Sequence, residues 1–174
     1  MENNVFAKRA SVRKFKPDAI PQEVIEQLLF AATQAPSAGN RQPWHFYVVK
    51  NEEMKAQLCK ISYNQKFIEE APVVLVVCAE PGRSAERYEE RGINLYCIQD
   101  TAAAIENILL CAVENGLGAC WCGAFSEEEV STAMGIDFTR RPIAIIPVGY
   151  PQDSILSKPK PQRRPMEETV TYVE

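Results

Sequence analysis

The most restrictive feature of this sequence is an uninterrupted apolar run, VVLVVCA, at residues 73–79. A run of this length without polar positions predicts a strand that is buried on both faces. Such a strand needs other elements packed on both sides, so the chain must fold as a layered domain of helices over a sheet. The longest strongly apolar stretch, residues 72–79, is far too short to cross a bilayer.

A second apolar segment, residues 93–115, has the spacing of a helix. Its AAAIENILLCA stretch is apolar nearly all round, which indicates a helix buried at the centre of the molecule or of a dimer. Gly116 and Gly118 follow this segment and end the helix.

The remaining elements are marked by their end signals. Pro21 suits a first helical position, Asn51 and Ser126 are N-cap residues, and Gly135 closes a helix. The mixed order predicts one α+β or α/β layered domain in a chain of 174 residues. We expect helices at 21–34, 52–61, 93–115 and 126–135, and strands at 44–49, 73–79, 119–124 and 142–150.

The C-terminal residues differ from the rest. Residues 151–165 contain four prolines among lysines and arginines, so they can form neither a helix nor a central strand. The following TVTYV, residues 169–173, predicts a strand. We therefore expect a core at 1–150 and an extended arm at 151–174 whose strand pairs with a second subunit. A flexible tail is the alternative.

Charge excludes two classes of partner. Nineteen basic and 23 acidic residues give a net charge of −4, with one histidine. This balance argues against a general binder of nucleic acid or of anionic membranes. The N-terminal MENNVFAKRA has no apolar signal-peptide core, so we expect a cytoplasmic protein.

The six cysteines include one close pair, Cys120 and Cys122, and no CxxC motif. On a strand both thiols of that pair would lie on one face, where a redox or metal role is conceivable. The simpler interpretation is that all six are small buried residues in apolar segments. We expect neither a metal site nor a catalytic thiol.

The segment KRASVRKF carries the first candidate site. Arg9, Ser11 and Arg13 alternate, so an extended backbone places all three on one face. Two guanidinium groups and a hydroxyl suit a doubly charged phosphate. The alternative is an ordinary solvated basic segment.

The segment APSAGNRQPWHF, residues 35–46, carries the second. Asn40 and Gln42 each offer a donor and an acceptor, which suits the edge of a flat heteroaromatic ring. Gly39 lets the backbone approach closely. The alternative is an ordinary helix-to-strand turn. Near the C-terminus, Arg163 and Arg164 could close over a phosphate or simply add solubilising charge.

Together these motifs resemble the nitroreductase family, the FMN-dependent NAD(P)H oxidoreductases, over nearly the whole chain. The resemblance includes RxSxRxF, APSAGNRQPWHF, EEAPVVLVV, GLGACWCGAF, IIPVGYP and RRP before the terminal strand. It implies an α+β fold, a nitroreductase-like α/β sandwich with a mixed, mostly antiparallel sheet. It also implies an obligate homodimer with FMN at both interface sites and an exchanged C-terminal strand.

The resemblance assigns the flavin contacts to residues of this sequence. Arg9, Ser11 and Arg13 match positions that hold the phosphate and ribityl chain, and Arg163 and Arg164 match a late basic position. Cys122 and Gly123 match a pair whose backbone reaches the reactive nitrogen of the ring. The remaining matches are the partner's loop at Pro36, Ser37 and Ala38, with Asn40 and Gln42 in the same motif, and a ring-edge contact at Asn64.

The implied activity is hydride transfer from NADH or NADPH to FMN, then reduction of a nitroaromatic, quinone or flavin, with ping-pong kinetics. No side chain needs to act in catalysis, and we assign none to His45. One alternative is a relative with dehalogenase or dehydrogenase chemistry, because the chain lacks the insertion that shapes the substrate pocket of larger members. Another is a flavin-binding redox partner that uses Cys120 and Cys122. No GxGxxG motif is present, so the choice between NADH and NADPH stays open.

Overall fold

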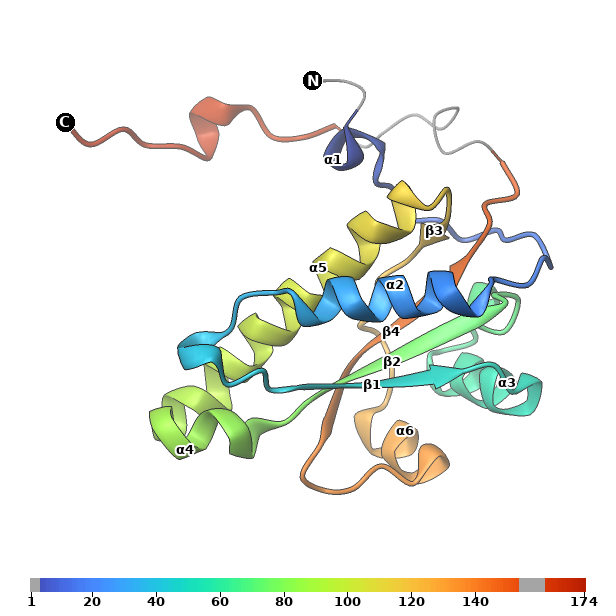
Figure 1. Ribbon diagram of the computed structural model, residues 1–174, viewed down its shortest axis with the longest axis horizontal. Helices are drawn as coiled ribbons and strands as arrows, with labels where there is room; N and C mark the ends of the chain where they lie inside the picture. The colour runs from blue at the N-terminus through green and yellow to red at the C-terminus, as the bar shows by residue number, and fades with distance from the viewer. Residues whose placement is uncertain (1–3, 154–161) are drawn as a thin grey trace.

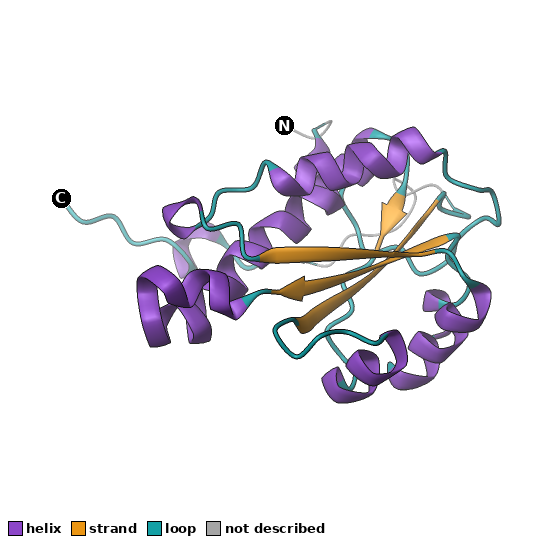
Figure 2. Ribbon diagram, turned by 60° about the horizontal axis from the view of Figure 1, so that its bottom comes forward, coloured by secondary structure: helices purple, strands orange, loops and turns teal. Residues whose placement is uncertain are grey.

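The computed structural model describes residues 4–153 and 162–174. In those residues a four-stranded sheet with the order β1-β2-β4-β3 forms the centre, and its neighbouring strands are antiparallel (Figures 1 and 2). This confirms the predicted α+β class. The strands are β1 (Trp44–Val49), β2 (Val73–Ala79), β3 (Gly118–Ala119) and β4 (Arg141–Gly149).

Strand β2 lies between β1 and β4, and each of its residues is at most 3% exposed. Val76 pairs with Tyr47 on one side and with Ile145 on the other. The predicted burial on both faces is confirmed. The apolar run left the strand direction open, because helices that cover both faces bury a central antiparallel strand as fully as a parallel one.

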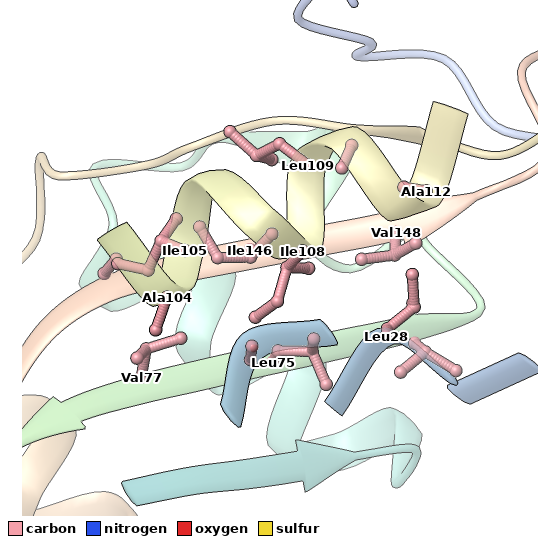
Figure 3. Packing of buried hydrophobic residues seen from close by; sticks show 14 of the residues in the cluster. Leu28, Leu75, Val77, Ala104, Ile105, Ile108, Leu109, Ala112, Ile146 and Val148 are labelled. Atoms are coloured by element: carbon pink, nitrogen blue, oxygen red, sulfur yellow. The ribbon is translucent and has the colours of Figure 1, made fainter. Parts of the chain in front are cut away.

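Helices α2 (Gln22–Thr33) and α5 (Cys97–Glu114) cover one face of the sheet (Figure 2). In Figure 3, Ile105 and Ile108 of α5 and Leu28 of α2 point toward β2 and β4. These three side chains are at most 1% exposed. Full burial of one such side chain is worth about 1.5–3 kcal/mol, so this layer anchors α5 firmly.

Helices α3 (Glu52–Ile61) and α6 (Glu127–Met134) cover the opposite face. The Asn51 side chain accepts a hydrogen bond from the Met54 N–H at 2.8 Å, and Ser126 caps α6 through the Glu129 N–H at 3.3 Å. Both predicted N-caps are therefore confirmed. Shorter elements are α1 (Val5–Lys8) and the turns η1 (Ala38–Asn40) and η2 (Lys66–Ile68).

The connection between β2 and α5 is itself helical. It forms α4 (Pro81–Arg91) and a π-helical turn, η3 (Gly92–Tyr96), which takes up the start of the helix predicted at 93–115. Glu89, with φ 46° and ψ −133°, breaks α4 so that η3 folds back against it. A Cβ at Gly92 would lie 2.5 Å from the Ser84 carbonyl oxygen, so this close approach requires glycine.

Two predicted strands differ from the structure. The strand expected at 119–124 is reduced to β3 and a single bridge between Cys122 and Ile145. Of the predicted arm, residues 154–161 lie outside the described residues, and 169–173 form no strand. That segment follows a short turn, η5 (Met166–Glu168), and Tyr172 is 82% exposed. In the single chain this segment forms no strand, because a strand needs a pairing edge and no described strand lies beside it; its pairing with a second subunit stays a prediction.

In the described part of the chain, no helix combines the length and apolarity that crossing a membrane requires.

Candidate functional site

The segment from Arg9 to Arg13 runs alongside β3. Ser11 forms a parallel bridge with Ala119, and the Val12 N–H donates to the Ala119 carbonyl at 3.0 Å. Val12 is buried, whereas Ser11 and Arg13 are exposed. The predicted alternation therefore places the Ser11 hydroxyl and the Arg13 guanidinium on the same outer face.

Arg9 has a different environment from Ser11 and Arg13. It directly follows α1, and its N–H donates to the Val5 carbonyl at 2.8 Å. Its Nε lies 3.9 Å from Glu106 Oε1 on α5. Arg9 thus meets a carboxylate, while no carboxylate of the described residues lies within ion-pair distance of Arg13.

Arg13 lies over the Phe67 ring, with 5.6 Å between Cζ and the ring centroid. Its charge also acts on the buried thiols of Cys120 and Cys122. The hydrogen bond from Cys122, with the Arg13 charge and the Ser11 hydroxyl, lowers the pKa of Cys120 to about 7 against the effect of burial. Donation to Cys120, together with burial, raises the pKa of Cys122.

Asn64 and Gly123 lie on neighbouring loops beside this group. The Gln65 Nε2 donates to the Ala124 carbonyl at 3.1 Å, which ties the loop of Asn64 to the loop of Gly123. A Cβ at Gly123 would meet nothing within 4 Å, so the space beside this backbone is open. The structure therefore brings together Ser11, Arg13, Asn64, Cys122 and Gly123, which we name the phosphate-side cluster.

The loop at residues 36–42 forms a second group, which we name the loop cluster. The Ala38 N–H donates to both carboxylate oxygens of Asp100, at 3.1 Å each. The Gln42 N–H donates to Ser37 Oγ at 3.0 Å, and its Nε2 donates to Asn40 Oδ1 at 3.2 Å. These bonds hold Ser37, Ala38, Asn40 and Gln42 in one arrangement.

Helix α4 supports this loop from outside. Arg41 Nε donates to the Arg83 carbonyl at 2.7 Å, and Arg83 Nε donates to the Arg41 carbonyl at 3.0 Å. Gly39 has φ +56°, and a Cβ there would lie 2.7 Å from the Tyr88 hydroxyl. Glycine at this position therefore allows both the turn and the close contact with α4.

A hollow of about 340 Å³ lies between this loop and the start of α5. Asp100 is 8% exposed, and burial raises the pKa of its carboxyl, although the Ala38 N–H opposes the shift. A carboxylate with a single neutral donor is incompletely satisfied. The lining residues are Pro36, Ser37, Ala38, Tyr96, Gln99, Asp100 and Ala103.

The two clusters lie apart within one chain. Figure 1 places the loop cluster at the N-terminal end of α5, beside α4. The segment at 9–13 lies toward the C-terminal end of α5, beside β3. The predicted pair Arg163 and Arg164 lies in the C-terminal segment, which extends away from the body in Figure 1. There Arg164 Nε meets Glu168 Oε2 at 3.3 Å, so a single chain brings neither arginine to a cluster.

Strained backbone marks the same two regions. Within residues 4–153 and 162–174, the non-glycine residues with positive φ are Asn40, Gln42, Tyr63, Asn64 and Glu89. Such conformations cost free energy and concentrate at functional sites. Sequence reasoning missed Asp100 and Tyr63. The signal available for Asp100 was that it is the one charged residue in the first half of α5, residues 97–105, whereas Tyr63 offered none.

The nitroreductase family profile matches this chain at residues 6–63 and 59–150. A protein of Archaeoglobus fulgidus named "Putative NADH dehydrogenase/NAD(P)H nitroreductase" is 38% identical over 149 residues, or 83% of this chain and 82% of its own. An iodotyrosine deiodinase of Thermotoga neapolitana is 29% identical and covers 95% of this chain and 94% of its own.

Among solved structures, a nitroreductase family protein from Clostridium novyi NT is 31% identical to this chain, with a TM-score of 0.78. The match covers 86% of this chain and 84% of that protein. The family profile spans most of the chain, and the solved structure has the same fold over 86% of it. The chain is therefore an oxidoreductase that belongs to the nitroreductase family.

Proposed function

We propose that this protein is an FMN-dependent oxidoreductase that oxidises NADH or NADPH and reduces a small aromatic acceptor. The observation that carries the proposal is the phosphate-side cluster. It contains a guanidinium without a carboxylate partner in the described residues, an adjacent exposed hydroxyl and an open backbone loop. The relative from Archaeoglobus fulgidus supports NAD(P)H as the reductant through its name.

The donors of this cluster fit FMN. Arg13 and Ser11 supply a charged and a neutral donor on one face, which suits a phosphate and the hydroxylated ribityl chain. Asn64 and the backbone N–H of Gly123 supply polar contacts for the ring, whereas the Cys122 N–H already donates to the Ile145 carbonyl at 3.0 Å. When bound, FMN supplies hydride acceptance and onward electron transfer, and the protein supplies position and electrostatics. No side chain of the cluster has to donate or remove a proton.

We further propose that the complete site is shared by two chains. Within one chain the loop cluster lies away from the phosphate-side cluster, so a second copy has to supply Pro36, Ser37 and Ala38 to the flavin. The exposed segment at 169–173 then gains a pairing edge on the partner, and Arg163 and Arg164 move with it. Such an arrangement makes flavin binding and dimerisation interdependent.

The hollow beside the loop suits one flat molecule at a time. Reduced nicotinamide and the acceptor therefore use it in turn, which gives ping-pong kinetics. Because pyridine nucleotides are the reductants, we place the enzyme in the cytoplasm. A nitroaromatic, a quinone or free flavin would serve as acceptor.

A second candidate function is reductive dehalogenation. It is favoured by the similarity to the iodotyrosine deiodinase of Thermotoga neapolitana, which extends over 95% of this chain. A panel of halogenated phenols and nitroaromatic compounds, each tested with NADH and NADPH, separates the two activities by their products.

The decisive experiment is an anaerobic titration of the purified protein. We expect a yellow protein with one FMN per chain, whose absorbance near 450 nm is bleached by NADH or NADPH and restored by a quinone. A protein that neither retains nor rebinds FMN contradicts the proposal. A protein that binds FMN but is not reduced by either nucleotide is instead a redox partner that receives its electrons from another protein.

A further inference from the structure

Two arginines without acidic partners border the hollow of the loop cluster. Arg87 and Arg91 lie in α4 on either side of the break at Glu89, and both are exposed. In the described part of the chain, neither forms an ion pair with a carboxylate. Two other arginines do have acidic partners: Arg41 pairs with Glu86, and Arg140 Nε lies 3.0 Å from Glu80 Oε1. The positive charge at Arg87 and Arg91 is thus left available.

Both guanidinium groups rest on tyrosine rings. The Cζ of Arg87 lies 5.6 Å from the Tyr88 centroid, and that of Arg91 lies 5.2 Å from the Tyr96 centroid. Arg91 Nε also donates to the Tyr96 hydroxyl at 2.9 Å. The two rings meet edge to face, with 5.0 Å between centroids. A guanidinium stacked in this way is held in place while most of its in-plane N–H donors stay free.

This stack is attached directly to the hollow. Tyr96 lines the hollow together with Asp100 and the loop at 36–38. On the other side, Arg87 lies against the loop, where a Cβ at Gly39 would be 3.2 Å from its Nη1. A molecule whose ring occupies the hollow would therefore have its outer part beside two oriented guanidinium groups.

Oriented guanidinium groups select phosphate, because their N–H donors match two phosphate oxygens at once. Of the molecules that use the hollow in turn, the nicotinamide dinucleotide always carries phosphates, whereas nitroaromatic and quinone acceptors carry none. We propose that Arg87 and Arg91 bind a phosphate group of the reduced nicotinamide dinucleotide, an inference that rests on the proposed function. Glu86 and Glu90 do not form ion pairs with these arginines, since they contact Arg41 and Asn94 instead.

The test uses steady-state kinetics of the FMN-loaded protein with three reductants. NADPH carries a 2′-phosphate and a pyrophosphate, NADH carries the pyrophosphate alone, and 1-benzyl-1,4-dihydronicotinamide carries no phosphate. The variants are Arg87→Gln, Arg91→Gln and the double variant, and the acceptor is a neutral quinone. Lys60→Gln, which removes an exposed charge from α3, is the matched control.

We expect each arginine substitution to lower kcat/KM for NADPH about tenfold or more, mainly through KM, since a charge-assisted contact is lost. The arginine variants should oxidise the benzyl compound as fast as the wild type does. The Lys60→Gln control should match the wild type with every reductant. Loss with NADPH alone assigns the arginines to the 2′-phosphate, and equal loss with NADH assigns them to the pyrophosphate.

Two results would overturn the inference. One is unchanged kcat/KM for both dinucleotides in the double variant. The other is an equal loss with the benzyl compound, which would show that the arginines support the hollow and not a phosphate. Calorimetric binding of NADP⁺ to the oxidised protein gives a second readout, and its affinity should fall in both variants and with added salt. If the wild type oxidises no reductant at all, including the benzyl compound, the proposed function fails instead.

Discussion

The carboxylate of Asp100 accepts the backbone N–H of Ala38 with both oxygens, each at 3.1 Å. The two residues are 62 positions apart in the chain. The bond joins the first turn of α5 to the loop that we expect to face the flavin of a second subunit. Because α5 is fixed by the core, Asp100 transmits that rigidity to Ala38.

Replacing Asp100 separates its hydrogen bond from its charge. Asp100→Ala leaves the Ala38 N–H without its acceptor, so we expect the free energy of unfolding to fall by about 1–3 kcal/mol. Asp100→Asn keeps one acceptor oxygen and should lose less. Urea denaturation and fluorescence titration of FMN measure both effects. Equal losses in the two variants would mean that the charge matters and the bond does not.

The pH dependence of stability should carry the signature of Asp100. Burial raises the pKa of its carboxyl above the unfolded value of about 3.9. Between these two pKa values the folded state binds more protons, so this group's contribution to stability falls as pH rises through that window. Asp100→Asn removes the effect. Subtracting the unfolding free energies of the two proteins at each pH isolates it, and a flat difference would contradict the assignment.

Arg13 should matter for FMN binding. Arg13→Ala removes a charge-assisted phosphate contact, worth about 1.5–3 kcal/mol, so the dissociation constant should rise at least tenfold. Arg9→Ala should also weaken binding, but less, since Arg9 already meets Glu106 at 3.9 Å. Fluorescence titration of the apoprotein with FMN measures both, with Lys60→Ala as the control. Unchanged affinity in both arginine variants would remove the phosphate assignment.

The C-terminal arm should hold the dimer together. A chain that ends after Pro151 lacks Arg163, Arg164 and the segment at 169–173. Light scattering should show a monomer or an aggregate in place of a dimer, and the flavin should be lost. A truncated protein that stays dimeric and yellow would show that the arm contributes to neither.

The thiols of Cys120 and Cys122 should be dispensable for turnover. Both are buried, at 2% and 4% exposed, although the pKa of Cys120 is lowered to about 7. The double variant Cys120→Ser/Cys122→Ser should therefore keep FMN and most NAD(P)H oxidation, and metal analysis should find no stoichiometric zinc or iron. A double variant that binds FMN yet reduces no acceptor would give the thiols a part in the mechanism.

Signals between neighbours in the sequence determined much of the fold and part of the site. The apolar run at 73–79 specified a central strand, and Asn51 and Ser126 specified helix starts, because strand burial and capping depend on residues a few positions apart. The alternation of Ser11 with Arg13 likewise follows from the two-residue period of an extended backbone. Strand direction was not encoded in this way, since it depends on which strands become neighbours.

Tertiary packing alone decided the remaining relationships. Asp100 meets Ala38, and Arg87 reaches Gly39, only because α4, η3 and α5 fold back along the loop that follows α2. The separation of the loop cluster from the phosphate-side cluster depends in the same way on where α5 lies across the sheet. Residues 169–173 have the composition of a strand, but they form no strand in the single chain. Strand propensity fixes which backbone conformation is favourable, but hydrogen bonds to a neighbouring edge are needed to form the strand, and only the folded arrangement supplies that edge.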